Sequence, residues 1–97
     1  MVTIQKKDSL NPTIKQRFFN DLGYNYMNKK DYVTAIEVFK INVALYPKNS
    51  NSYNRLANAY LKNSDTIKAI ENYKKALEIN PENRHSIRSL KRIKKDE

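Results

Sequence analysis

The feature that most constrains this chain is the stretch 50–83, which carries two apolar stripes at helical spacing. Residues three or four positions apart lie on one face of a helix. The stripe residues are Tyr53, Leu56, Ala57 and Tyr60 in the first half, and Ala69, Ile70, Tyr73, Ala76 and Leu77 in the second. Pro81 ends the second helix, because proline has no amide hydrogen. Two helices with one apolar face each need another copy beside them to bury those faces.

A second copy of the pattern occupies residues 16–49. Eight positions agree in identity or in kind at one constant offset, which we call the repeat period: Pro81 with Pro47, Tyr73 with Phe39, Ile70 with Ile36, Ala69 with Ala35, Tyr60 with Tyr26, Ala57 with Gly23, Leu56 with Leu22, and Tyr53 with Phe19. A fixed period of this length is typical of a stacked helical array. The small residues Gly23 and Ala57 are predicted to lie where the two helices of each unit cross closely.

The order of these residues resembles the tetratricopeptide repeat. That family carries an aromatic residue, a leucine, a small residue and an aromatic residue on its first helix. An alanine, an aromatic residue and a small residue follow on the second helix, and then a proline. Residues 50–83 match every position, and residues 16–49 match all but one, where Asn42 stands in place of Ala76. The resemblance implies an all-α, right-handed α–α superhelix of two helix–turn–helix repeats and a C-terminal capping helix.

The chain is predicted to comprise an N-terminal arm (1–12), a first repeat (13–49), a second repeat (50–83) and a capping helix with a basic tail (84–97). Helices are expected from Thr13 to about Asn28, from Asp31 to about Tyr46, from Ser50 to about Lys62, from Asp65 to about Asn80, and over 84–95. Thr13, Asp31 and Asp65 are predicted to cap the first, second and fourth of these helices. Glycine is absent from both turns, so Asn28 and Asn63 are predicted to be left-handed there. Because arrays of this kind need roughly three repeats, we expect support from a homodimer, the arm or a parent domain.

Composition limits the class of protein. The 97 residues make at most one domain, and the absence of cysteine excludes disulfides and thiolate chemistry. No apolar run is long enough to span a bilayer, and the first residues lack the apolar centre of a secretion signal. We therefore expect a cytoplasmic protein if the chain is complete, and predict no location for a fragment. The net charge of +9 is densest in the last fourteen residues, which permits weak polyanion binding.

No catalytic constellation is found in the sequence. His85 is the only histidine, and no triad, metal site or glycine-rich phosphate loop can be built around it. We expect it on the surface, in the first turn of the capping helix. Three glutamates, Glu37, Glu71 and Glu78, are expected to form solvated ion pairs with neighbouring lysines. The sequence predicts no enzyme, no cofactor and no metal.

In the resembled family, the first helices of successive units line a concave groove that binds extended peptides. Its positions are held here by Arg17, Asn20, Tyr24, Asn51, Asn54, Arg55, Asn58, Arg88 and Arg92. Asparagine amides pair with a peptide backbone and arginine binds carboxylates. The resemblance therefore implies an extended, acidic or C-terminal segment as ligand. A polar face that binds only solvent is the alternative.

The family also includes a clamp for the carboxylate ends of heat-shock chaperones, built from lysine, asparagine and arginine. The five clamp positions hold Asn20, Tyr24, Arg55, His85 and Ser89. The sequence therefore does not predict binding of chaperone tails.

A second candidate surface is apolar. It consists of Phe18, Val38, Ile41 and Leu45, and we call it the docking stripe. Phe18 stands where the second unit has Ser52, at a position that packs on the preceding unit. The stripe is predicted to dock another chain or domain, and the alternative is local repacking around Asn42.

Residues 39–47, with 51–53 and 59–61, also resemble the repeat-bearing tail behind some bacterial serine hydrolase domains of the penicillin-recognising and esterase type. That narrower resemblance implies an appendage of a catalytic domain.

The favoured interpretation is a non-catalytic interaction module whose partner is a protein or peptide. One alternative keeps the fold and makes the chain a structural tail that docks on a parent enzyme or self-associates. The other is weak binding of a polyanion or nucleic acid through the capping helix, which we expect less than a protein partner. No membrane partner is predicted.

Overall fold

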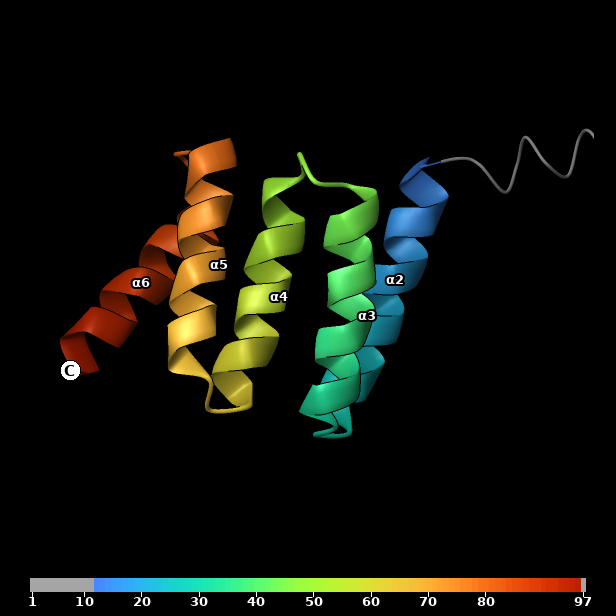
Figure 1. Cartoon of the computed structure of the whole chain (residues 1–97), viewed down its shortest axis with the longest axis horizontal. Helices are drawn as coiled ribbons and strands as arrows, with labels where there is room; N and C mark the ends of the chain where they lie inside the picture. The colour runs from blue at the N-terminus through green and yellow to red at the C-terminus, as the bar shows by residue number, and fades with distance from the viewer. Residues whose placement is uncertain (1–11, 97) are drawn as a thin grey trace, which may run out of the picture.

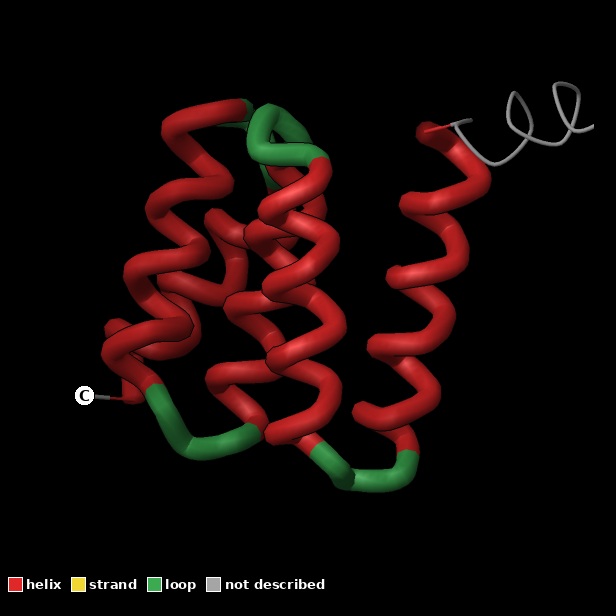
Figure 2. Tube along the Cα trace, turned by 45° about the vertical axis from the view of Figure 1, so that its right-hand side comes forward, coloured by secondary structure: helices red, strands yellow, loops and turns green. Residues whose placement is uncertain are grey.

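The computed structural model describes residues 12–96, and this part of the chain is a row of helices without strands. The helices are α2 (Pro12–Asn28), α3 (Tyr32–Leu45), α4 (Ser50–Lys62), α5 (Thr66–Ile79) and α6 (Arg84–Asp96). Consecutive helices run antiparallel and pack side by side from one end of the molecule to the other (Figure 1). Short loops join them, as Figure 2 shows. The all-α repeat superhelix predicted from the sequence is confirmed. The predicted arm lies outside the described residues, apart from Pro12.

The helix boundaries repeat with the sequence period. Asp31 accepts a hydrogen bond from Thr34 N at 3.2 Å and caps α3. Asp65, one repeat period later, accepts one from Lys68 N at 3.3 Å and caps α5. Side-chain acceptors at this position satisfy amide groups that the first helical turn leaves free. Both aspartate caps were predicted, and they fix the start of the second helix in each unit.

The prediction that Asn28 and Asn63 are left-handed is wrong. The residues with positive φ are Lys30, at 63°, and Ser64, at 66°. Helical hydrogen bonding reaches past Asn28, since Lys29 N donates to Asn25 O at 3.2 Å, and the amide of Asp31 then bonds to Tyr26 O at 2.9 Å. A bond of this second kind closes a helix end when the residue before the donor is left-handed. The left-handed residue is therefore the one directly before each capping aspartate.

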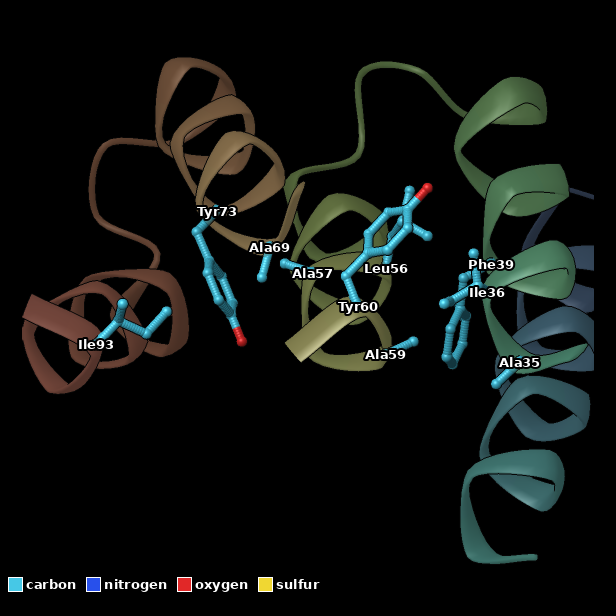
Figure 3. Close-up of a cluster of buried hydrophobic side chains, with 10 residues drawn as sticks. All are labelled: Ala35, Ile36, Phe39, Leu56, Ala57, Ala59, Tyr60, Ala69, Tyr73 and Ile93. Carbon is cyan, nitrogen blue, oxygen red and sulfur yellow. The ribbon is translucent and has the colours of Figure 1, made fainter. Parts of the chain in front are cut away.

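The core runs along the row of helices and is built from the repeat anchors. Phe39, Ala57, Ala69 and Tyr73 are fully buried. Figure 3 shows these side chains and their neighbours from α3, α4, α5 and α6 directed into the spaces between helices. Burial of such side chains from water is the main stabilising term of the fold.

The predicted close crossing of α2 and α3 is present at Gly23. A Cβ atom placed on Gly23 would overlap the ring of Phe39, whose Cδ1 would lie 2.9 Å away. Phe39 is fully buried, so its ring cannot move into solvent. The absence of a side chain at position 23 is what allows the two helices to approach this closely.

Helix α6 follows the pattern of a first helix in a repeat, with two exceptions. Ile87 and Leu90 take the positions of Tyr53 and Leu56, but Lys91 takes the position of Ala57 and Lys94 takes that of Tyr60. Lys91 is exposed, whereas Ala57 is fully buried. A lysine at the crossing position keeps any following helix from approaching α6 as closely as α5 approaches α4.

Candidate peptide groove

The first helices of the successive units, α2, α4 and α6, together form an open pocket of about 170 Å³. Its lining residues are Tyr24, Asn51, Asn54, Arg55, Asn58 and His85. Four of the six come from α4, and α2 and α6 supply one each. The helix in the middle of the row therefore provides the floor, and its neighbours provide the walls.

Five of the nine residues proposed for the groove line this pocket, and the other four lie elsewhere. Arg17 is exposed on α2. Asn20 is half-buried and accepts a hydrogen bond from Asn42 Nδ2 at 2.7 Å. Arg88 lines a separate hollow on α6 with Arg84, Ile87 and Lys91. Arg92 is exposed, and its charge acts on the hydroxyl of Tyr73.

The sequence reasoning placed His85 on the surface and left it out of the groove. It is exposed, and it also lines the pocket. The signal was the repeat period, because His85 lies one period after Asn51, which was included. The same position on α2 is Arg17, which lies outside the pocket.

None of the described residues that line the pocket is a carboxylate. Among the described residues, the ion pairs are Lys40 with Glu37 and Lys75 with Glu78, both at 3.6 Å and both away from the groove. These pairs were predicted, whereas the third glutamate, Glu71, forms none with a described side chain. Arg55 likewise has no carboxylate partner there. The pocket therefore offers positive charge and hydrogen-bond donors to a ligand.

Tyr73 of α5 contacts the groove through Asn58, one of the residues that line the pocket. Its hydroxyl donates to Asn58 Oδ1, and its ring lies fully buried between the helices (Figure 3). Burial raises the pKa of Tyr73, and nearby Tyr24 adds to the increase. The Ser89 hydroxyl and the charge of Arg92 lower that pKa in part. The phenol is thus held neutral, with its proton available to the asparagine.

Tyr24 forms one wall of the pocket and is held by an aromatic contact. Its ring packs edge-on against Phe39 at a centroid distance of 5.5 Å and an angle of 72°. Such pairs are favoured because the positive ring edge meets the negative ring face. Tyr24 nevertheless stays 40% exposed, so its remaining surface is open to a ligand.

Three of the four residues of the docking stripe are exposed in the structure, and the fourth is buried. Phe18, Ile41 and Leu45 are 59%, 47% and 49% exposed, but Val38 is only 7% exposed and belongs to the interior. Val38 turns inward because it lies one helical turn before Asn42, which is also buried. Ser52 and Ser86, the counterparts of Phe18, are buried at the junctions between units. Phe18 therefore marks the edge where a preceding unit would pack.

The described residues offer neither a metal site nor a membrane span. Among the described residues, no three side chains of the metal-binding types are grouped to hold an ion. No helix in that part of the chain is both long and apolar enough to cross a bilayer.

Comparisons with known proteins were made for the sequence and for the fold. Residues 50–83 match the tetratricopeptide repeat family model. No curated protein matches the chain. Nothing in these comparisons supports the narrower resemblance to a hydrolase tail.

Two solved structures share the fold. The second TPR domain of human RPAP3, in complex with the HSP70 peptide SGPTIEEVD, is 21% identical with a TM-score of 0.72, over 78% of this chain and 63% of that chain. The first TPR of Spaghetti (RPAP3), bound to the HSP90 peptide SRMEEVD, is 22% identical with a TM-score of 0.76. The match covers 92% of this chain and 68% of that chain. This chain thus spans less than two thirds of the human domain. The family model thus covers residues 50–83, and the two solved domains show that this chain shares the TPR fold.

Proposed function

We propose that this protein is a non-catalytic interaction module that binds an extended, acidic or C-terminal segment of a partner protein between α2, α4 and α6. The observation that carries the proposal is the lining of the pocket. Helix α4 contributes three asparagine amides and an arginine, α6 a histidine and α2 a tyrosine, and no carboxylate among the described lining residues opposes them. Such a surface suits carboxylates and backbone carbonyls.

The related folds add support for a peptide ligand. The two RPAP3 domains are described with peptides that contain the acidic run Glu-Glu-Val-Asp. At 21% and 22% identity they share the fold with this chain, and partners do not carry over from fold alone. The five clamp positions of this chain differ from the family's clamp. We therefore propose the acidic class of ligand and not a chaperone tail.

Arg55 provides the test. We expect acidic nonapeptides to bind the full chain more tightly than the same peptides with lysine in place of each acid. An arginine–carboxylate hydrogen bond contributes about 1.5–3 kcal/mol. Arg55→Ala should therefore weaken binding of the acidic peptides roughly ten-fold or more, as measured by calorimetry.

Arg84→Ala is the matched control, because Arg84 is exposed on α6 and lines a different hollow. It should leave acidic-peptide binding unchanged. Equal binding of the acidic and lysine peptides, or equal losses in the two variants, would contradict the proposal.

Three large apolar residues exposed on α2 and α3, Phe18, Ile41 and Leu45, favour one second candidate, a docking contact with a parent domain or a second copy. Exposed apolar patches are typical of contact surfaces. Phe18→Ser would restore the residue type found at positions 52 and 86. Loss of a self-association seen by sedimentation in the unmodified chain would support this candidate.

A further inference from the structure

Three asparagines of α4 share a feature beyond their place in the groove. An asparagine amide has one carbonyl acceptor and one nitrogen with two donors. In Asn51, Asn54 and Asn58, the carbonyl oxygen accepts a hydrogen bond from another residue of the protein. The nitrogen of each has no partner among the described residues. In all three amides, therefore, the oxygen is bonded within the protein and the nitrogen is left without a described partner.

The orientation of Asn51 follows from a chain of hydrogen bonds. Ser50 donates its hydroxyl proton to Ala76 O at 2.7 Å, so the Ser50 oxygen is left to accept. Asn83 Nδ2 donates to that oxygen at 2.7 Å and to Asn51 Oδ1 at 3.2 Å. Asn83 Oδ1 accepts from Ser86 N at 3.3 Å, which fixes which end of Asn83 is the donor. Asn51 can meet this nitrogen only with its carbonyl.

Asn54 and Asn58 present their carbonyl oxygens to hydroxyl groups. Fully buried Ser86 donates to Asn54 Oδ1 at 2.9 Å. Tyr73 donates to Asn58 Oδ1. The nearby Ser89 hydroxyl lowers the pKa of the phenol in part.

Among the described side chains, two buried polar atoms lack a hydrogen-bond partner, Asn42 Oδ1 and Ser52 Oγ. The nitrogens of Asn54 and Asn58 do not belong to this group. Both residues line the pocket, so their free N–H groups are open to a ligand there. Arg55 and His85 add further N–H donors to the same surface.

We propose that Tyr73, Ser86 and Asn83 are positioning residues that hold the three α4 asparagines as hydrogen-bond donors, so that the groove selects ligands that present acceptors. The ligands that fit are extended segments with backbone carbonyls, aspartate, glutamate or a free carboxylate directed at α4. Lysine or arginine at the same place would find no carbonyl to accept its protons. This inference rests on the proposed function, because it specifies what the groove recognises.

The first test uses small probes and the full, isotopically labelled chain. Sodium acetate presents only acceptors, methylammonium chloride presents only donors, and sodium chloride matches the ionic strength. We expect acetate to shift the side-chain amide signals of the three asparagines in a saturable manner, and methylammonium to match sodium chloride. Saturable shifts of these amides by methylammonium, or an acetate response equal to that of sodium chloride, would overturn the proposal.

The second test removes single donors. Tyr73→Phe retains the buried ring but frees the carbonyl of Asn58, and Ser86→Ala does the same for Asn54. Each should reduce the acetate shift of its own asparagine while the other two respond as before. Loss of one such hydrogen bond should also weaken acidic-peptide binding about five-fold.

Tyr60→Phe is the matched control, because Tyr60 is a similarly buried tyrosine whose hydroxyl bonds to no described groove residue. A merely structural role for Tyr73 would lower the melting temperature and change all three amides together, and that result would contradict a positioning role. If no acidic peptide binds but acetate still selects the three amides, the proposed function fails and the donor orientation stands.

Discussion

At the scale of single residues, Gly23 and Phe39 show how one missing methyl group sets the spacing of a helix pair. The second unit has Ala57 at the same position and Tyr73 opposite it, and both are fully buried. In the first unit, the ring of Phe39 packs against Gly23, which has no side chain. The two units therefore reach the same architecture with different contacts at the crossing.

We expect Gly23→Ala to destabilise the chain by about 1–2 kcal/mol, because overpacking a filled site typically costs about 1–3 kcal/mol and alanine returns less than about 1 kcal/mol of helix propensity. The measurement is the free energy of unfolding in urea. The same substitution in a Phe39→Leu background should cost much less, because the ring is gone. An equal loss in both backgrounds would show that the ring is not the cause.

The groove asparagines mark the limit of sequence reasoning at this scale. The repeat period placed Asn51, Asn54 and Asn58 on the correct face. It gave no information on which end of each amide points outward, because Tyr73 and Ser86 decide this from other helices. Those two residues were assigned to packing or not considered, since contacts across helices are not encoded in local spacing.

At the scale of elements, the turns within the two units are closed in the same way. Lys30 and Ser64 are both left-handed, and each precedes an aspartate cap by one residue. Left-handed backbone costs an ordinary residue about 1–2 kcal/mol, because Cβ lies too close to the carbonyl oxygen. Neither turn uses glycine, which would avoid this cost.

Replacement of either residue with glycine should raise stability. We expect Lys30→Gly and Ser64→Gly each to gain about 0.5–1 kcal/mol, after the entropy that glycine adds to the unfolded chain is subtracted. Thermal unfolding followed by circular dichroism will report the gain. Lys29→Gly is the control, since Lys29 does not have a positive φ, and it should lower the melting temperature. A loss of stability at both left-handed positions would refute this account.

The elements themselves were largely predictable from the sequence. The apolar stripes and the caps Asp31 and Asp65 placed the helices correctly, because each helix buries one face and starts at a side-chain acceptor. The turn residues were missed because Asn28 and Asn63 are not equivalent positions, since a shift of one repeat period carries position 63 onto Lys29. Val38 was assigned to an exposed stripe because spacing alone does not distinguish the inner from the outer apolar face.

At the scale of the whole molecule, the charge is uneven. The net charge is +9, and the cations of α6 are exposed along its length. None of them forms an ion pair with a described side chain. The α6 surface also carries none of the exposed large apolar residues found elsewhere in the described chain. It is therefore suited to weak electrostatic contacts.

We expect weak, sequence-independent binding of duplex DNA that falls steeply as salt rises, because the bound cations release counterions. The triple variant Arg88→Gln, Lys91→Gln, Arg92→Gln should reduce both the affinity and the salt dependence in fluorescence anisotropy. The control variant Lys29→Gln, Lys30→Gln, Lys62→Gln removes the same charge from the intra-unit turns and should have a smaller effect. Binding that is insensitive to salt would contradict this prediction.

Lys91 has a practical consequence for anyone who wishes to lengthen this scaffold. If further helix pairs were added after α6, the Lys91 side chain would lie between α6 and the next helix, where Ala57 lies between α4 and α5. The first added helix would then be held too far from α6. Lys91→Ala is thus the first substitution that a longer, engineered version of this scaffold requires.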